Sequence, residues 1–320
     1  MRGADYVIKR TIFAVVTVFV ALTINFIIFR AAPGSAVSNL ARVPGATHAL
    51  RAELEHEFGL DKPKLQQYFI YLGQLAHGNL GVSFASQQPV SHELLQALGN
   101  TIPMVLLGTL FAIGFGTFTG ILAAYRRGTA VDKASVSTGL FFYSLPTQWL
   151  GLMLLLIFAG TLPSGGRVDA FLFNPTPLQH ILDVLKHMLL PSLTLGLVLY
   201  GEYTLITRSA MLETLGEDYI LTARAKGLSD RRIVTRHAFR NAMLPITTLI
   251  ALSLGYIVAG SILIERVFSW PGIGQAVYYS VQNRDYPMLQ GAFLLLTLSV
   301  VFFNYVADLL YFKLDPRIRE

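Results

Sequence analysis

The chain has 320 residues, of which 53% are hydrophobic and 14% charged, and its formal net charge is +6. About a quarter of the residues of a soluble protein are charged, so this composition indicates a membrane protein. The positive charge does not indicate nucleic-acid binding, because the Lys and Arg residues lie at the ends of apolar runs rather than on one patterned face. The absence of cysteine excludes a disulfide framework, a thiolate metal site and a cysteine nucleophile.

Six apolar runs are long enough, or nearly long enough, to cross a membrane, which takes about 20 apolar residues in a helix. The first, Thr11 to Phe29, contains no charged residue and is too long for the apolar part of a cleaved signal peptide. The other five fall within 94–125, 134–166, 188–207, 241–264 and 286–307. We therefore expect an all-α polytopic membrane protein with six transmembrane helices.

The positions of Lys and Arg predict the orientation of these spans. Six spans place both termini on one side, together with the loop at 126–133 and the loop at 208–242. These four segments contain 16 of the 25 Lys and Arg residues. Positively charged loops face the cytoplasm, so we expect both termini and the 208–242 loop to be cytoplasmic.

The external segment 31–97 separates the first span (1–30) from the remaining chain (98–320), and it is too long to be a simple connection. Apolar residues recur in it at helical spacing twice, on either side of Pro63. They are Leu50, Leu54 and Phe58 in the first group, and Leu65, Phe69 and Leu72 in the second. We expect two short helices that form an external cap over the spans.

The polar 208–242 loop is predicted to contain two short helices separated by Gly227. The first helix has Glu217 and Asp218 in its first turn and Arg224 and Lys226 in its last turn, which is the distribution that a helix dipole favours. Gly227 then suits the left-handed position that ends a helix. A short helix tethered to spans at both ends is suited to contact something outside the bilayer.

The sequence DYILTARAKGLSDRRIVTRHAFRNAMLP in this loop resembles the EAA loop of ABC importer permeases, in the dipeptide, oligopeptide and nickel branch. Leu221, Thr222 and Ala223 depart from the general motif, and the longer spacing from Gly227 to Pro245 is what we expect of the peptide branch. FGLDKPKLQQYFIYLGQLAHGNLGVSF in the external segment resembles the same family, as does VFSWPGIGQ followed by RDYP. These three stretches have the family's order and span nearly the whole chain.

The resemblance implies a type I ABC importer permease fold in a bacterial plasma (inner) membrane. It also implies a second homologous permease, expected to be a different chain, two ABC ATPase subunits and an external solute-binding protein. The implied cargo is a di- or oligopeptide or a similar small solute, although relatives also handle nickel chelates, glutathione and haem. The residues implied to couple the chain to an ATPase are Glu217, Asp218, Tyr219, Thr222, Ala223, Arg224, Ala225, Lys226 and Gly227.

The segment 265–287 after the fifth predicted span is too short to cross the membrane. Its Ser269-Trp270-Pro271-Gly272 stretch reads as a turn, so we expect an external re-entrant loop with Trp270 at the membrane interface. The candidate residues for contact with the binding protein are Phe268, Trp270, Pro271 and Gly272.

Glu202 is the ionisable residue that stands out within a predicted span, because charge inside a membrane is costly. It lies about 21 Å along the fourth span, near the inner leaflet. Together with Tyr200 and Tyr203 it is a candidate for a polar pathway or gate. The alternative is a structural carboxylate that pairs with a neighbouring basic side chain or subunit.

No GxxxxGK[ST] phosphate loop is present, so we expect ATP and Mg to bind to partner ATPase subunits and predict no cofactor, metal or catalytic residue in this chain. The stretch from His92 to Gln96 lacks the second histidine of an HExxH zinc site, which disfavours a membrane-embedded enzyme. A self-sufficient channel or secondary carrier is the other alternative. It would show charges in several spans or an inverted repeat, whereas we find one carboxylate and no clear repeat.

Overall fold

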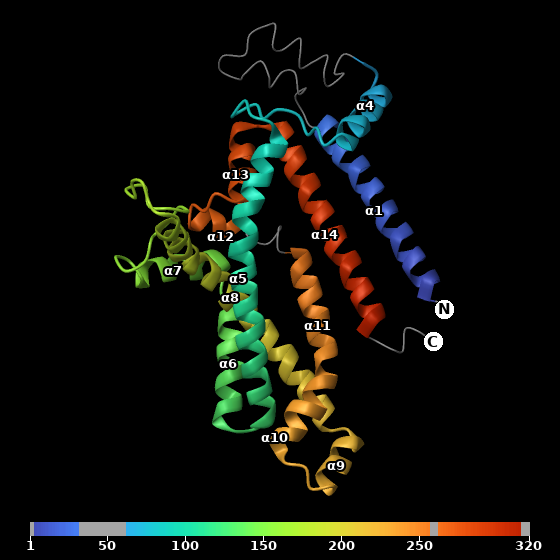
Figure 1. Cartoon of the computed structure of the whole chain (residues 1–320), viewed down its shortest axis with the longest axis vertical. Coiled ribbons are helices and arrows are strands. Elements are labelled where there is room, and N and C mark those ends of the chain that lie inside the picture. Colours follow the sequence, from blue (N-terminus) through green and yellow to red (C-terminus); the bar gives the residue numbers. More distant parts are fainter. Residues whose placement is uncertain (1–2, 32–61, 257–261, 315–320) are drawn as a thin grey trace.

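The structure is a computed structural model that describes residues 3–31, 62–256 and 262–314, and these ranges are almost entirely helical (Figure 1). One isolated antiparallel bridge joins Val82 to Pro89. The helices are α1 (Gly3–Ala31), α4 (Lys64–Ala76), α5 (Val90–Tyr125), α6 (Ala130–Ser144), α7 (Thr147–Ile157), α8 (Pro177–Leu215), α9 (Asp218–Ala225), α10 (Asp230–Arg232), the π-helix η1 (Ile233–Ala238), α11 (Phe239–Tyr256), α12 (Ile262–Val267), α13 (Ile273–Asn283) and α14 (Tyr286–Leu314).

Four helices in the described ranges are long and apolar enough to cross a membrane: α1, α5, α8 and α14. The pair α6 and α7 passes the same test together, but the two helices are bent by 104° relative to each other. The fifth predicted run falls on α11 and α12, which flank residues 257–261, outside the described ranges. The prediction of an all-α polytopic membrane protein is confirmed, and the third predicted run falls on two helices with a sharp bend between them.

The break between α6 and α7 follows from Pro146. A proline disfavours the helical conformation of the residue before it, and Leu145 has an extended backbone with ψ of 135°. Pro146 then stands directly before the first residue of α7. The apolar residues continue on both sides of the break, so composition alone did not reveal it.

The longest helix pair is formed by α5 and α8, which lie against each other through much of the molecule (Figure 1). Glycines on α5 permit the close contact. A Cβ atom on Gly116 would lie 2.6 Å from the Cβ atom of Tyr203, and one on Gly120 would lie 2.6 Å from that of Thr207. Larger residues at these two positions would push the helices apart.

The external segment is helical where it is described. The second of its two predicted helices is α4, whose Tyr68 and Tyr71 rings lie 5.2 and 5.5 Å from the ring of Phe26 in α1. The first, with Leu50, Leu54 and Phe58, falls outside the described residues. Helix α5 begins at Val90 and therefore extends back into the 31–97 segment.

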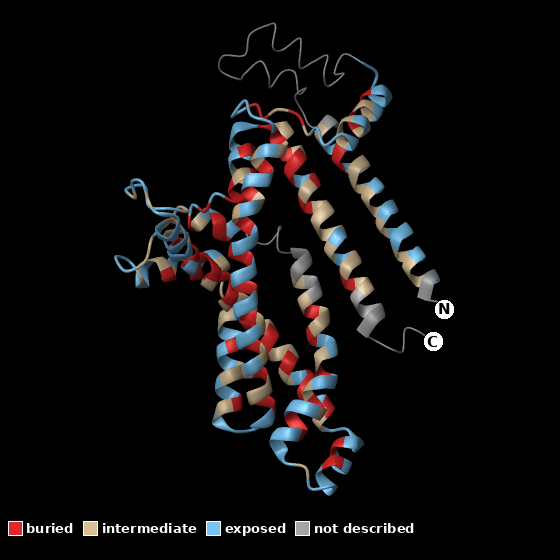
Figure 2. Ribbon diagram, in the orientation of Figure 1, coloured by how far each residue is buried: buried red, intermediate tan, exposed pale blue. Residues whose placement is uncertain are grey.

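Helix α1 lies at the edge of the molecule, packs against α14 and is largely exposed (Figure 2). At one end of this pair Arg10 forms an ion pair of 3.1 Å with Asp308. Phe13 and other large apolar residues of α1 face outward, as expected for a helix surrounded by lipid. The main buried core lies instead among α5, α8, α12, α13 and α14.

Candidate functional site

The 208–242 loop forms one end of the molecule, where α9 and α10 project beyond the long helices (Figure 1). Helix α8 continues to Leu215, so residues 208–215 belong to it, and residues 239–242 belong to α11. Glu217 precedes the first residue of α9, and its side chain makes no capping hydrogen bond. Glu217 and Asp218 therefore act on the helix start through charge, and Arg224 lies in the last turn as predicted.

Helix α9 has one face against the bundle and one face open. Ile220 is fully buried and Ala223 is 6% exposed, and both pack with residues of α8, η1 and α11. Leu221 is 59% exposed, although it is a large apolar residue. Leu221 is not in the predicted coupling set, whose residues are all exposed apart from Ala223: Glu217, Asp218, Tyr219, Thr222, Arg224, Ala225, Lys226 and Gly227. An open face with an exposed leucine is suited to contact another protein.

The connection after α9 is well defined. Gly227 has φ of +73°, the left-handed conformation predicted for it, and its amide donates to the carbonyl oxygen of Arg224 at 2.9 Å. The chain then runs through α10 into η1, and from there directly into α11. A π-helical turn at this junction lets the loop join a long helix with altered register, and such turns often occur at functional sites.

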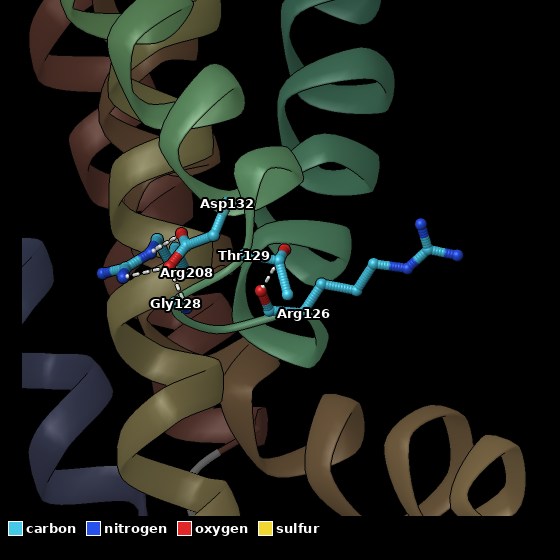
Figure 3. A network of polar contacts seen from close by, with 5 residues as sticks. All are labelled: Arg126, Gly128, Thr129, Asp132 and Arg208. Carbon is cyan, nitrogen blue, oxygen red and sulfur yellow. Dashed lines mark hydrogen bonds and ion pairs between the residues drawn. The ribbon is translucent and has the colours of Figure 1, made fainter.

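An ion pair supports the loop from the neighbouring turn (Figure 3). Arg208 of α8 donates from Nε to Asp132 Oδ1 at 2.6 Å and from a terminal nitrogen to Oδ2 at 2.9 Å. The amide of Gly128 donates to the same Oδ2 at 2.9 Å. Asp132 is buried, so this bidentate ion pair fixes the turn between α5 and α6 to the C-terminal part of α8.

A cavity of about 840 Å³ lies between that turn and the 208–242 loop. Its lining includes the cationic residues Arg126, Arg127 and Arg224, together with Asp230. The side chain of Arg126 extends away from the Asp132 ion pair, as Figure 3 shows. The face of the molecule around α9 is therefore open and predominantly basic.

On the other side of the molecule, α12 and α13 form a hairpin that includes most of segment 265–287, for which a re-entrant loop stays a prediction. Glu265 is fully buried and accepts hydrogen bonds from Thr101 Oγ1 at 2.7 Å and from the amide of Gln275 at 3.1 Å. Thr101 Oγ1 in turn accepts from the amide of Ile273 at 2.9 Å. The carboxylate therefore joins α12, α13 and α5 at one point.

The structure buries three of the four candidate residues for contact with the binding protein. Trp270 is 1% exposed and its Nε1 donates to the carbonyl oxygen of Asn100 at 3.0 Å, so its side chain packs inside the protein rather than on its surface. Phe268 lies in the same core, and Gly272 packs directly against Thr101 and Glu265. Of the four residues, Pro271 alone is exposed.

The three candidate pathway residues are separated by their surroundings. Tyr200 is buried against Phe115 and Phe142, with ring centroids 5.4 and 6.5 Å away. Tyr203 is fully buried and its hydroxyl donates to Ser253 of α11 at 2.9 Å. Glu202, between them in sequence, is half-buried and lines a groove between α8 and α11.

Sequence reasoning missed three buried carboxylates: Asp132, Glu265 and Asp285. Asp285 accepts from Ser83 Oγ at 2.5 Å and from the amide of Met288 at 3.2 Å, and so connects the external segment to the start of α14. These residues lie at the ends of apolar runs, where acidic residues ordinarily face water. Their positions next to glycine and proline turns were the available signal, since buried turns need acceptors for their amides.

Comparison with known proteins places the whole chain among transport components. Residues 116–320 match the family described as binding-protein-dependent transport system inner membrane component, and residues 4–105 match the corresponding amino-terminal family.

Relatives that align over nearly their full length are named as permease proteins of peptide or glutathione transport systems. The di/tripeptide transport system permease protein DppB of Pseudomonas aeruginosa (strain UCBPP-PA14) is 38% identical over 332 aligned residues, covering 99% of each chain. The dipeptide transport system permease protein DppB of Escherichia coli (strain K12) is 39% identical and covers 98% of each chain. The glutathione transport system permease protein GsiC of Escherichia coli O6:H1 is 34% identical, covering 98% of this chain and 99% of its own.

A solved structure has the same fold. A chain of the MetNI methionine ABC transporter in an inward-facing conformation aligns with a TM-score of 0.52 and 18% sequence identity. The alignment covers 69% of this chain and 96% of that chain.

Proposed function

The chain belongs to the family of inner membrane components of binding-protein-dependent transport systems, and from this we propose that it is a permease subunit of an ATP-driven importer of di- or oligopeptides. The observation that carries the proposal is the match to peptide permeases over 98 to 99% of both chains. A likeness over the full length covers the spans, the external segment and the 208–242 loop together.

The exposed face of α9 is the site proposed for ATPase docking. Leu221, Thr222 and Ala225 would enter a groove on the partner, while Ile220 and Ala223 hold α9 on the bundle. Movement of the ATPase subunits would then be passed through α9 and η1 to α8 and α11, which are joined by the hydrogen bond from Tyr203 to Ser253. This is rigid-body switching between two packed states.

This mechanism requires the 208–242 loop and both termini to be cytoplasmic, which the distribution of Lys and Arg supports. The complete importer would contain a second, different permease, two ATPase subunits that bind ATP and Mg, and an external solute-binding protein. The binding protein would approach the end with α13 and meet the exposed Pro271 rather than the buried Trp270.

Purification and reconstitution test the proposal. The chain, tagged and coexpressed with the second permease and the ATPase subunits, should copurify with both. In liposomes supplied with the binding protein, the complex should take up labelled dialanine when ATP is present and should not do so without ATP. Uptake of dialanine by the chain alone, without nucleotide, would contradict the proposal and favour a secondary carrier.

Glutathione is the second candidate cargo, because one relative that covers nearly the whole chain has the name of a glutathione permease. The same liposomes distinguish the two solutes. Saturating uptake of labelled glutathione with no uptake of dialanine would replace peptides by glutathione while leaving the importer assignment intact.

A further inference from the structure

Glu202 differs from the buried carboxylates Asp132, Glu265 and Asp285 because its side chain has no partner among the residues that the structure describes. Among the described residues, no hydrogen bond or ion pair reaches its side chain, whereas Asp132, Glu265 and Asp285 each accept at least two hydrogen bonds. It lies about 20 Å from the last residue of α8, measured along the helix axis. The paired structural carboxylate that the sequence left open is therefore not supported by this chain's described residues.

The surroundings of Glu202 are a groove of about 590 Å³ between α8 and α11. Its other lining residues are Ile206, Leu244, Pro245, Thr248 and Leu249. The hydroxyl of Thr248 donates to the carbonyl oxygen of Leu244 at 3.0 Å, within its own helix. Among the described residues that line the groove, Glu202 is thus the single charged group, and the others are mainly apolar.

The two helices that form the groove are joined by a hydrogen bond next to Glu202. Tyr203, the next residue of α8, is fully buried and its hydroxyl donates to Ser253 of α11 at 2.9 Å. This bond fixes the distance between α8 and α11 at the residue that follows Glu202. The carboxylate is therefore presented on a rigid frame rather than on a mobile loop.

An unpaired carboxylate in a membrane-spanning helix is unfavourable unless water or a cation reaches it. On the proposed function, a permease forms part of a solute path, and a groove on that path would admit both water and a cationic solute. We propose that Glu202 binds the α-ammonium group of the peptide as it passes between α8 and α11. A primary ammonium has three N–H donors and suits a carboxylate whose groove has no Lys or Arg among its described lining residues.

The inference predicts that the groove is wet and negatively charged in the assembled importer. Because the chain contains no cysteine, Thr248→Cys introduces a unique thiol on this chain, across the groove from Glu202. In the complete reconstituted complex this thiol should react with a cationic methanethiosulfonate faster than with an anionic one of similar size. The ratio of the two rates should fall about tenfold when Glu202→Gln is added, because the charge that attracts the cation is removed.

Glu213→Gln is the matched control. Glu213 is an exposed carboxylate on the same helix, nearer its end, and is not among the described residues that line the Glu202 groove, so its replacement should leave the ratio unchanged. Excess dialanine should slow the cationic reagent, and N-acetyldialanine, which has no ammonium group, should not.

Three results would overturn the inference. A thiol at position 248 that reacts with neither reagent means that another subunit or lipid covers the groove. A ratio of cationic to anionic reaction rates that is unchanged by Glu202→Gln means that the carboxylate is not an accessible charge. Equal protection by dialanine and N-acetyldialanine means that the ammonium is not recognised. In each case ATP-dependent uptake of dialanine by the unmodified complex would still support the proposed function.

Discussion

The two ends of the molecule hold their connecting segments in different ways. At the end with α13, Glu265 is fully buried and its carboxylate receives donors from two elements. At the end with α9, the connecting helix is held by small apolar contacts, and most of its residues are exposed. At the end with α13, the buried carboxylate is paired within the chain. At the end with α9, one face of the connecting helix is exposed. The exposed face of α9 is therefore available to bind a partner protein.

The largest loss of stability is expected at Glu265. Glu265→Ala removes the acceptor for Thr101 and for the amide of Gln275, both of which are buried. We expect the free energy of unfolding to fall by about 3 kcal/mol or more, since each unsatisfied buried donor is costly. Thermal unfolding of the purified complex in detergent measures this. A melting temperature equal to that of the unmodified complex would remove the distinction between the two ends.

Ala223→Asp should have the next largest effect, since Ala223 is one of the two buried residues of α9, with Ile220. A carboxylate placed there without a partner should destabilise the packing of α9 by about 2 kcal/mol or more. Hydrogen exchange of the α9 amides should increase while that of α13 is unchanged. Faster exchange across the whole chain would show that the loop does not unfold separately.

The ion pair between Asp132 and Arg208 connects the exposed end to the bundle. A double-mutant cycle with Asp132→Ala and Arg208→Ala should give a coupling energy of about 1 to 3 kcal/mol in unfolding, because the contact is two-pronged and Asp132 is buried. Arg208→Lys should recover only part of it, because a lysine cannot make both bonds in this geometry. Additive single-variant effects would mean that the pair is not a structural link.

The smallest change in stability is expected at Leu221. Leu221→Asp alters a residue that is 59% exposed, so the free energy of unfolding should change by less than about 0.5 kcal/mol. Copurification of the ATPase subunits should nevertheless drop sharply, because a charge replaces the apolar side chain at the proposed contact. Full retention of the ATPase subunits would place the docking surface elsewhere.

The sequence predicted the helical membrane fold, the helix at α9 and the left-handed Gly227, because hydropathy, end charges and a glycine after a helix are local signals. It did not predict the bend at Pro146, since apolar residues continue through it. It also did not predict that Trp270 is buried inside the protein, and it overlooked Glu265. Both errors have one cause, which is that burial of these two residues depends on Asn100 and Thr101, distant in sequence.

The most direct test of the account is site-specific crosslinking in the complete complex. A photoreactive amino acid at Leu221, on the open face of α9, should crosslink to an ATPase subunit. The same group at Tyr279, which is exposed on α13 at the other end, should crosslink to the solute-binding protein or to no soluble partner. A crosslink from position 221 to the binding protein, or from position 279 to the ATPase, would contradict the proposed orientation and docking surface.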